Sequence, residues 1–118
     1  MSPIKPIEID CKKVGPATVM TLSGHISTAE SRLVSENLER IIAEKTLNLV
    51  VDMSGVDIIT SDGLGALIRA RKSSGEAGGT VVLSGLQGNI LDIFRMTRLD
   101  KIFSLYDSVD EAVASFPT

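Results

Sequence analysis

The 118-residue sequence has no tryptophan, three phenylalanines and one tyrosine, so aliphatic side chains must form its core. Its single cysteine, Cys11, excludes an internal disulfide and a cysteine-rich zinc site. The sequence also lacks an excess of basic residues, since 15 Asp and Glu outnumber 12 Lys and Arg. The formal net charge of −3 argues against a general nucleic-acid binder, because neutralising phosphates takes a basic face. No stretch approaches the ~20 apolar residues of a membrane span, and residues 1–10 lack the apolar core of a secretory signal. We therefore expect residues 1–118 to form one soluble, cytoplasmic domain without nucleic-acid or membrane partners.

Short apolar segments with alternating or β-branched residues are typical of strands. Residues 7–12 and 18–23 flank turn residues and predict a hairpin, with Gly24 ending its second strand. Residues 46–53 fit a strand buried on both faces, followed by a turn at Ser54 and Gly55. Two further strands are expected over residues 80–84 and 103–106.

Apolar residues at helical spacing predict four helices. The first begins at Ser27 or Thr28, the second is stopped by glycines 78 and 79, and the last runs over residues 108–116 with Ser108 as its cap. The positions expected to be buried are Val34, Leu38, Ile41 and Ile42 in the first helix, Leu64, Leu67 and Ile68 in the second, and Ile90, Leu91 and Phe94 in the third. The order β-β-α-β-α-β-α-β-α predicts an α/β domain with a mixed, mostly parallel sheet of about five strands and about four helices.

Two enzyme-like patterns are incomplete. Gly63-Leu-Gly65 opens the second helix as in dinucleotide-binding proteins, but the third small residue of that fingerprint is replaced by the bulky Ile68. Ser61 and the single histidine, His25, could form a hydrolase pair, yet the first glycine of the nucleophile elbow is replaced by Ile59. The sequence therefore favours a protein without catalytic, cofactor-binding or metal-binding residues.

Two carboxylates, Asp52 and Asp57, flank the expected turn before Ser61. Paired acids can perform acid–base chemistry, but acids beside a turn more commonly accept hydrogen bonds from backbone N–H groups. We favour this structural role for both.

The segment Thr60-Ser61-Asp62 lies where a strand leads into the second helix, so Ser61 is a natural N-cap. A hydroxyl at this position would be exposed to a kinase. A phosphate placed there would meet unpaired backbone N–H groups and the positive end of the helix dipole.

The stretch Val51-Asp-Met-Ser-Gly-Val-Asp-Ile-Ile-Thr-Ser-Asp-Gly-Leu-Gly-Ala-Leu-Ile68 resembles the signature of STAS domains, specifically bacterial anti-sigma factor antagonists. Later segments are similar too: GGTVVL at residues 78–83, FRMTRLDKIF at 94–103 and YDSVDEA at 106–112. The likeness covers nearly the whole chain.

This resemblance implies a partner-switching protein. Its unphosphorylated form would bind a serine kinase that is also an anti-sigma factor, with a histidine-kinase-like ATPase fold. The kinase would phosphorylate Ser61, and a PP2C-type phosphatase would remove the phosphate. The partner-binding residues expected from it are Ser27, Thr60, Asp62, Gly63, Arg69 and Lys72.

Three positions depart from the family pattern. Thr60 stands where the family often has Asp, Asp62 where it has Ser or Thr, and Ser27 where an acidic residue is common. The alternative is a STAS interaction module without a phosphoswitch, belonging to a signalling scaffold or a lipid-transport complex. In that case Ser61 only caps the helix.

Overall fold

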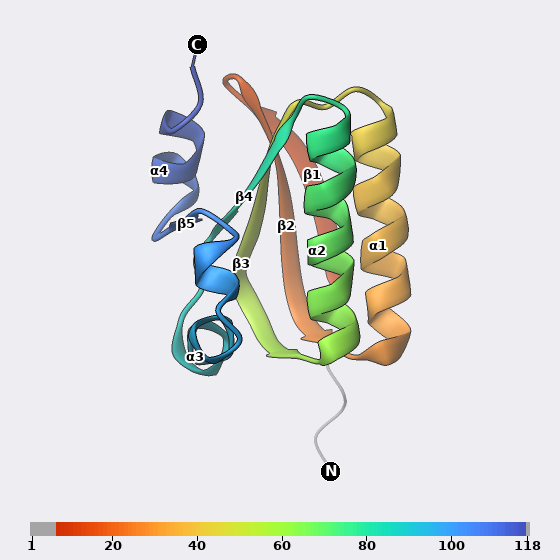
Figure 1. Cartoon of the computed structure of the whole chain (residues 1–118), viewed down its shortest axis with the longest axis vertical. Coiled ribbons are helices and arrows are strands. Elements are labelled where there is room, and N and C mark those ends of the chain that lie inside the picture. The colour runs from red at the N-terminus through yellow and green to blue at the C-terminus, as the bar shows by residue number, and fades with distance from the viewer. Residues whose placement is uncertain (1–6, 118) are drawn as a thin grey trace.

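Strands and helices follow one another in the order that the sequence predicts (Figure 1). The computed structural model describes residues 7–117. Its elements are β1 (Glu8–Val14), β2 (Ala17–Ile26), α1 (Thr28–Ala43), β3 (Asn48–Ile59), α2 (Ser61–Glu76), β4 (Thr80–Ser84), α3 (Gly88–Met96), the 3₁₀ turn η1 (Leu99–Lys101), β5 (Leu105–Tyr106) and α4 (Val109–Ala114). The expected α/β class is confirmed. Among these residues, no helix has the length and apolar character needed to cross a membrane.

The five strands form one sheet in the order β1-β2-β3-β4-β5. β1 and β2 are antiparallel, and the remaining neighbours are parallel. Because β2 and β3 are parallel, their last residues, Ile26 and Ile59, are register partners where the carboxyl ends of the two strands meet. The loops that lead into α1 and α2 therefore begin side by side.

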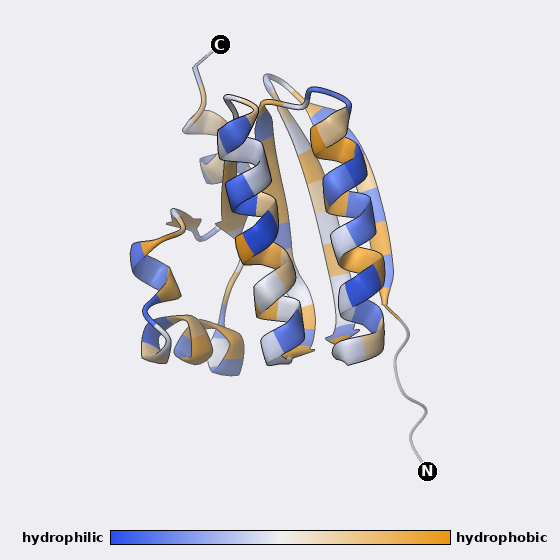
Figure 2. Cartoon of the chain, turned by 45° about the vertical axis from the view of Figure 1, so that its right-hand side comes forward, coloured by the Kyte–Doolittle hydropathy of each residue, from blue (hydrophilic) through white to orange (hydrophobic). Residues whose placement is uncertain are grey.

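Apolar residues cover both faces of the sheet because successive side chains of a strand point to opposite sides. Leu49 and Val51 of β3 belong to a large cluster that includes residues of α1, α2 and α3, whereas Val50 packs in a smaller cluster with Ala112 and Phe116 around α4. Figure 2 shows α1 and α2 side by side against the sheet, with many hydrophilic residues on their outer surfaces.

Two expected breaks are wrong, because β2 continues through Gly24 and β3 continues through Ser54 and Gly55. The β2–β3 register shifts at both places, which is the signature of β-bulges. An added Cβ at Gly55 would lie 2.6 Å from the Cβ of Ser23, and Gly24 has a φ of +105°. Gly55 therefore permits the close approach of β3 to β2, and Gly24 permits a positive φ within β2. Neither glycine forms a turn that ends its strand.

The predicted burial of Ile68 is also wrong, since this side chain is 41% exposed. The buried face of α2 instead contains small residues, among them Gly63, Ala66 and Ala70, alongside Leu67. The last strand is shorter than expected: Phe103 lies outside it and packs edge-to-face on Phe94, with ring centroids 6.2 Å apart.

Candidate phosphorylation site

Ser61 is the first residue of α2, and the N-cap is Thr60, one residue earlier than expected. Thr60 is half-buried, and both its N–H and its hydroxyl donate to the carbonyl oxygen of Ile26, at 3.0 and 3.3 Å. Ser61 is exposed, and its hydroxyl makes no hydrogen bond within residues 7–117. Of the two adjacent hydroxyls, the one on Ser61 is therefore accessible.

The backbone around Ser61 suits a phosphate. The first N–H of α2 with an intrahelical acceptor is that of Leu64, which donates to the carbonyl of Thr60 at 3.0 Å. The N–H groups of residues 61–63 precede it and have no such acceptor, as in every helix N-terminus. Together with the positive end of the helix dipole, these groups favour an anion at this end of α2.

The N-termini of α1 and α2 are joined by side chains. The Thr28 hydroxyl donates to a carboxylate oxygen of Asp62 at 2.8 Å. Ser27 is the half-buried N-cap of α1, and its N–H donates to Glu30 in a capping box. The structure thus brings Ser27, Asp62 and Ser61 to one end of the molecule, together with Glu30 and with Thr28, which was expected only as a possible start of the first helix.

Gly63, one of the expected partner-binding residues, is buried in the first turn of α2. An added Cβ at Gly63 would lie 2.8 Å from side-chain carbons of both Ile26 and Ile59 and 3.2 Å from the Ile26 carbonyl oxygen. This glycine lets the first turn of α2 rest directly on the ends of β2 and β3, which fixes the position of Ser61.

Arg69 and Lys72 are exposed on later turns of α2. The guanidinium of Arg69 reaches back over Gly65, because a Cβ at Gly65 would lie 3.2 Å from its Nη1. Lys72 is about 16 Å along the helix from Ser61, given a rise of ~1.5 Å per residue. Arg69 therefore extends toward the N-terminal end of α2, whereas Lys72 lies apart from it.

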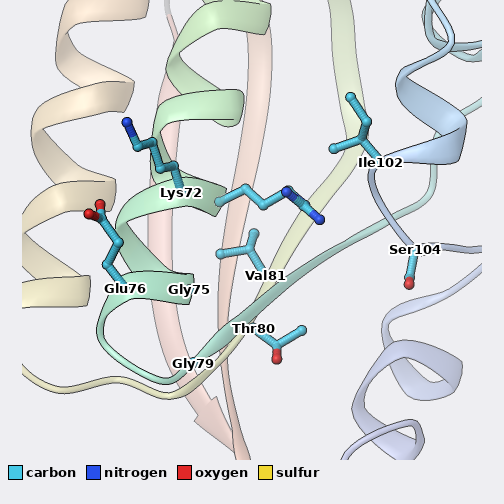
Figure 3. Close-up of a pocket in the computed structure, with 9 residues that line it drawn as sticks. Lys72, Gly75, Glu76, Gly79, Thr80, Val81, Ile102 and Ser104 are labelled. Carbon is cyan, nitrogen blue, oxygen red and sulfur yellow. The ribbon is translucent and has the colours of Figure 1, made fainter.

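Lys72 lines a groove of about 460 Å³ between α2 and the segment around β5 (Figure 3). Thr80 and Val81 of β4 lie between Lys72 on one side and Ile102 and Ser104 on the other. The groove adjoins the C-terminal half of α2 and does not include Ser61. It is therefore separate from the candidate phosphorylation site.

Two isoleucines near Ser61 in the chain are more exposed than their hydrophobicity predicts. Ile58, close to the end of β3, is 49% exposed and Ile68 is 41% exposed. Ser61, the half-buried Leu64 and Ile68 fall at helical positions i, i+3 and i+7, so they share one stripe of α2. An apolar side chain within the predicted buried stripe could not be recognised as exposed without the tertiary structure.

The alternative catalytic residues have structural partners. The carboxylate of Asp52 accepts a hydrogen bond from the Ser54 N–H at 3.0 Å, as favoured above. The imidazole of His25 lies 3.9 Å from the carboxylate of Asp57. No hydrogen bond joins His25 to Ser61, and no cluster of possible metal ligands is found among residues 7–117.

These features define a class of protein. The STAS domain model matches residues 8–112, and the chain belongs to the STAS domain family. A crystal structure of an anti-sigma factor antagonist from Mycobacterium paratuberculosis has a TM-score of 0.88 at 23% identity and covers 98% of this chain and 97% of its own. SpoIIAA from Bacillus, in its phosphorylated form, has a TM-score of 0.72 at 13% identity, covering 92% and 98%. BtrV of Bordetella bronchiseptica, named as a proposed anti-sigma factor antagonist, is 22% identical over 95% of this chain and 97% of its own length.

Proposed function

We propose that this chain is a cytoplasmic, non-enzymatic partner switch of the anti-sigma factor antagonist type. Unphosphorylated, it binds a serine kinase that acts as an anti-sigma factor; phosphorylation of Ser61 releases it, and a PP2C-type phosphatase restores binding. The observation that carries this proposal is the exposed Ser61 hydroxyl at the start of α2, which has no hydrogen-bond partner among residues 7–117. The similarity to proteins named anti-sigma factor antagonists supports it.

The energetics favour a switch in docking over a switch in folding. A phosphoryl group adds about −1.5 to −2 charges at pH 7. In water, the repulsion between this phosphate and Asp62 at ~4 Å is on the order of 1 kcal/mol per charge. The favourable interaction of the phosphate with the helix N-terminus offsets ~0.3–1 kcal/mol of this repulsion. Burying the same group against a partner without a matching cation costs several kcal/mol. Phosphorylation therefore leaves the domain folded and weakens docking about a hundredfold. SpoIIAA offers a parallel, since its phosphorylated and unphosphorylated forms match this fold with TM-scores of 0.72 and 0.71.

A nearby carboxylate compensates for the departure at Ser27. The carboxylate of Glu30 lies against Ser27, where the resembling family often has an acid. Asp62 adds a negative charge directly after Ser61, where that family has Ser or Thr, and this charge opposes docking. We infer that the partner docks over the Glu30 carboxylate and the exposed Ser61, Ile68 and Arg69, with Asp62 at the margin of this surface.

The test is phosphopeptide mapping after incubation with the serine kinase of the same organism and ATP. We expect one phosphate on the wild-type chain, located on Ser61. Thr60→Val should still accept the phosphate, because the Thr60 hydroxyl is turned toward Ile26, whereas Ser61→Ala should accept none. If the wild-type protein stays unmodified, the phosphorylation switch is contradicted. The alternative function, a STAS interaction module without a phosphoswitch, would then be favoured.

A further inference from the structure

The outer edge of β1 is a seven-residue strand edge with no partner among residues 7–117. β1 pairs only with β2, on its inner side. An unpaired edge can accept another strand, and proteins usually protect such edges with charged residues. β1 does carry such charges, and their order along the strand indicates how a second strand could pair with it.

The charges of β1 are divided by sign about Cys11. Glu8 and Asp10 precede it, and Lys12 and Lys13 follow it. If two copies of β1 pair antiparallel about a twofold axis at Cys11, Asp10 lies opposite Lys12 of the partner subunit, and by symmetry this pair occurs twice. Of the five twofold registers centred on residues 9 to 13, the other four place like charges opposite each other. The strand is thus self-complementary in one register.

The flank of α1 above this edge adds apolar and mixed-charge surface. Leu33, Arg40 and Glu44 fall at i, i+7 and i+11 and so lie on one side of the helix. Leu33 is 45% exposed, and Arg40 and Glu44 line a cleft of about 290 Å³ together with Cys11. Opposite charges on one flank are suited to meeting their own copy across a twofold axis.

We infer that the chain forms a twofold homodimer in which β1 pairs with β1 of a second copy, centred on Cys11, and the α1 flanks pack beside it. The two sheets then form one continuous sheet. This inference is independent of the proposed function. α2 lies on the other side of α1 from this edge, so each copy keeps its Ser61 available (Figure 2).

The test is analytical ultracentrifugation of charge-swapped variants. The wild type should sediment as a dimer of the 12.6-kDa chain at the higher concentrations used. Asp10→Lys and Lys12→Asp each put like charges opposite each other and should each weaken dimerisation about tenfold or more. A mixture of the two variants should associate, because each Lys then faces an Asp. The double variant with both substitutions should dimerise like the wild type.

Cys11 provides a second readout because it is the only cysteine. A short bismaleimide adds to two thiols and should link two wild-type chains through Cys11. A control with Cys11→Ser and Glu76→Cys, which moves the thiol to the exposed end of α2, should give little linked dimer. A wild type that stays monomeric at its highest soluble concentration would overturn the inference. A dimer that persists in both single variants, or variants that fail to associate on mixing although circular dichroism shows them folded, would equally overturn it.

Discussion

The hydroxyl of Thr28 donates a hydrogen bond to the carboxylate of Asp62 at 2.8 Å, across 34 positions of sequence. This contact joins the first turn of α1 to the first turn of α2 beside Ser61. The carboxylate of Asp62 is thereby held at the surface where a partner would dock. Its fixed negative charge resembles part of the charge that a phosphate on Ser61 would add.

Asp62→Ser should therefore tighten binding to the cognate serine kinase. Removing one charge next to the docking surface changes the affinity by about fivefold, equivalent to roughly 1 kcal/mol. Thr28→Val is the matched control, because it removes the hydrogen bond and keeps the charge. Isothermal titration calorimetry should show tighter binding for Asp62→Ser only. Unchanged affinity for Asp62→Ser would show that its charge does not oppose docking.

Gly63→Ala should destabilise the domain by about 1–3 kcal/mol, because the new methyl group would overlap Ile26 and Ile59 at 2.8 Å. Gly75 in the same helix has no atom within 4 Å of an added Cβ, so Gly75→Ala should stabilise by up to about 1 kcal/mol. Urea unfolding measures both free energies. Equal stability of Gly63→Ala and the wild type would contradict the close packing of α2 on the strand ends.

Cys11 should react slowly with iodoacetamide at neutral pH. Burial raises the pKa of its thiol, Arg40 opposes this shift, and Asp10 and Glu44 add to it. Since the thiolate is the reactive form, the rate in the folded protein should rise at higher pH than the rate for the same chain unfolded in urea. Arg40→Gln should move the profile to still higher pH and Glu44→Gln to lower pH. Identical profiles for folded and unfolded chains would refute the shift.

The fold was largely predictable because it depends on local periodicity. The apolar spacing of α1 marks its buried residues Val34, Leu38 and Ile41, and Ser108 caps α4 as expected by accepting from the Glu111 N–H. The predicted strand ends were wrong where a glycine is compatible with two backbone structures. Gly24 and Gly55 could mark turns or bulges, and only the pairing of β2 with β3 distinguishes these.

The candidate site was predictable only in part. The position of Ser61 at the start of α2 follows from the change from strand to helix periodicity. The contacts of Thr28 with Asp62 and of Thr60 with Ile26 join residues 34 positions apart, so local patterns contain no signal for them. The exposure of Ile68 is likewise a tertiary effect. The face of α2 that packs against the rest of the domain contains the small residues Gly63, Ala66 and Ala70, and Ile68 lies outside that face.

The central claim is that a negative charge on Ser61 blocks docking while the domain stays folded. Calorimetry with the cognate serine kinase should show similar affinity for the wild type and Ser61→Ala. It should show affinity about a hundredfold weaker for the phosphorylated protein and a clear loss for Ser61→Asp, with unchanged unfolding curves. Equal affinity for all four forms, or loss of binding through unfolding, would contradict the account.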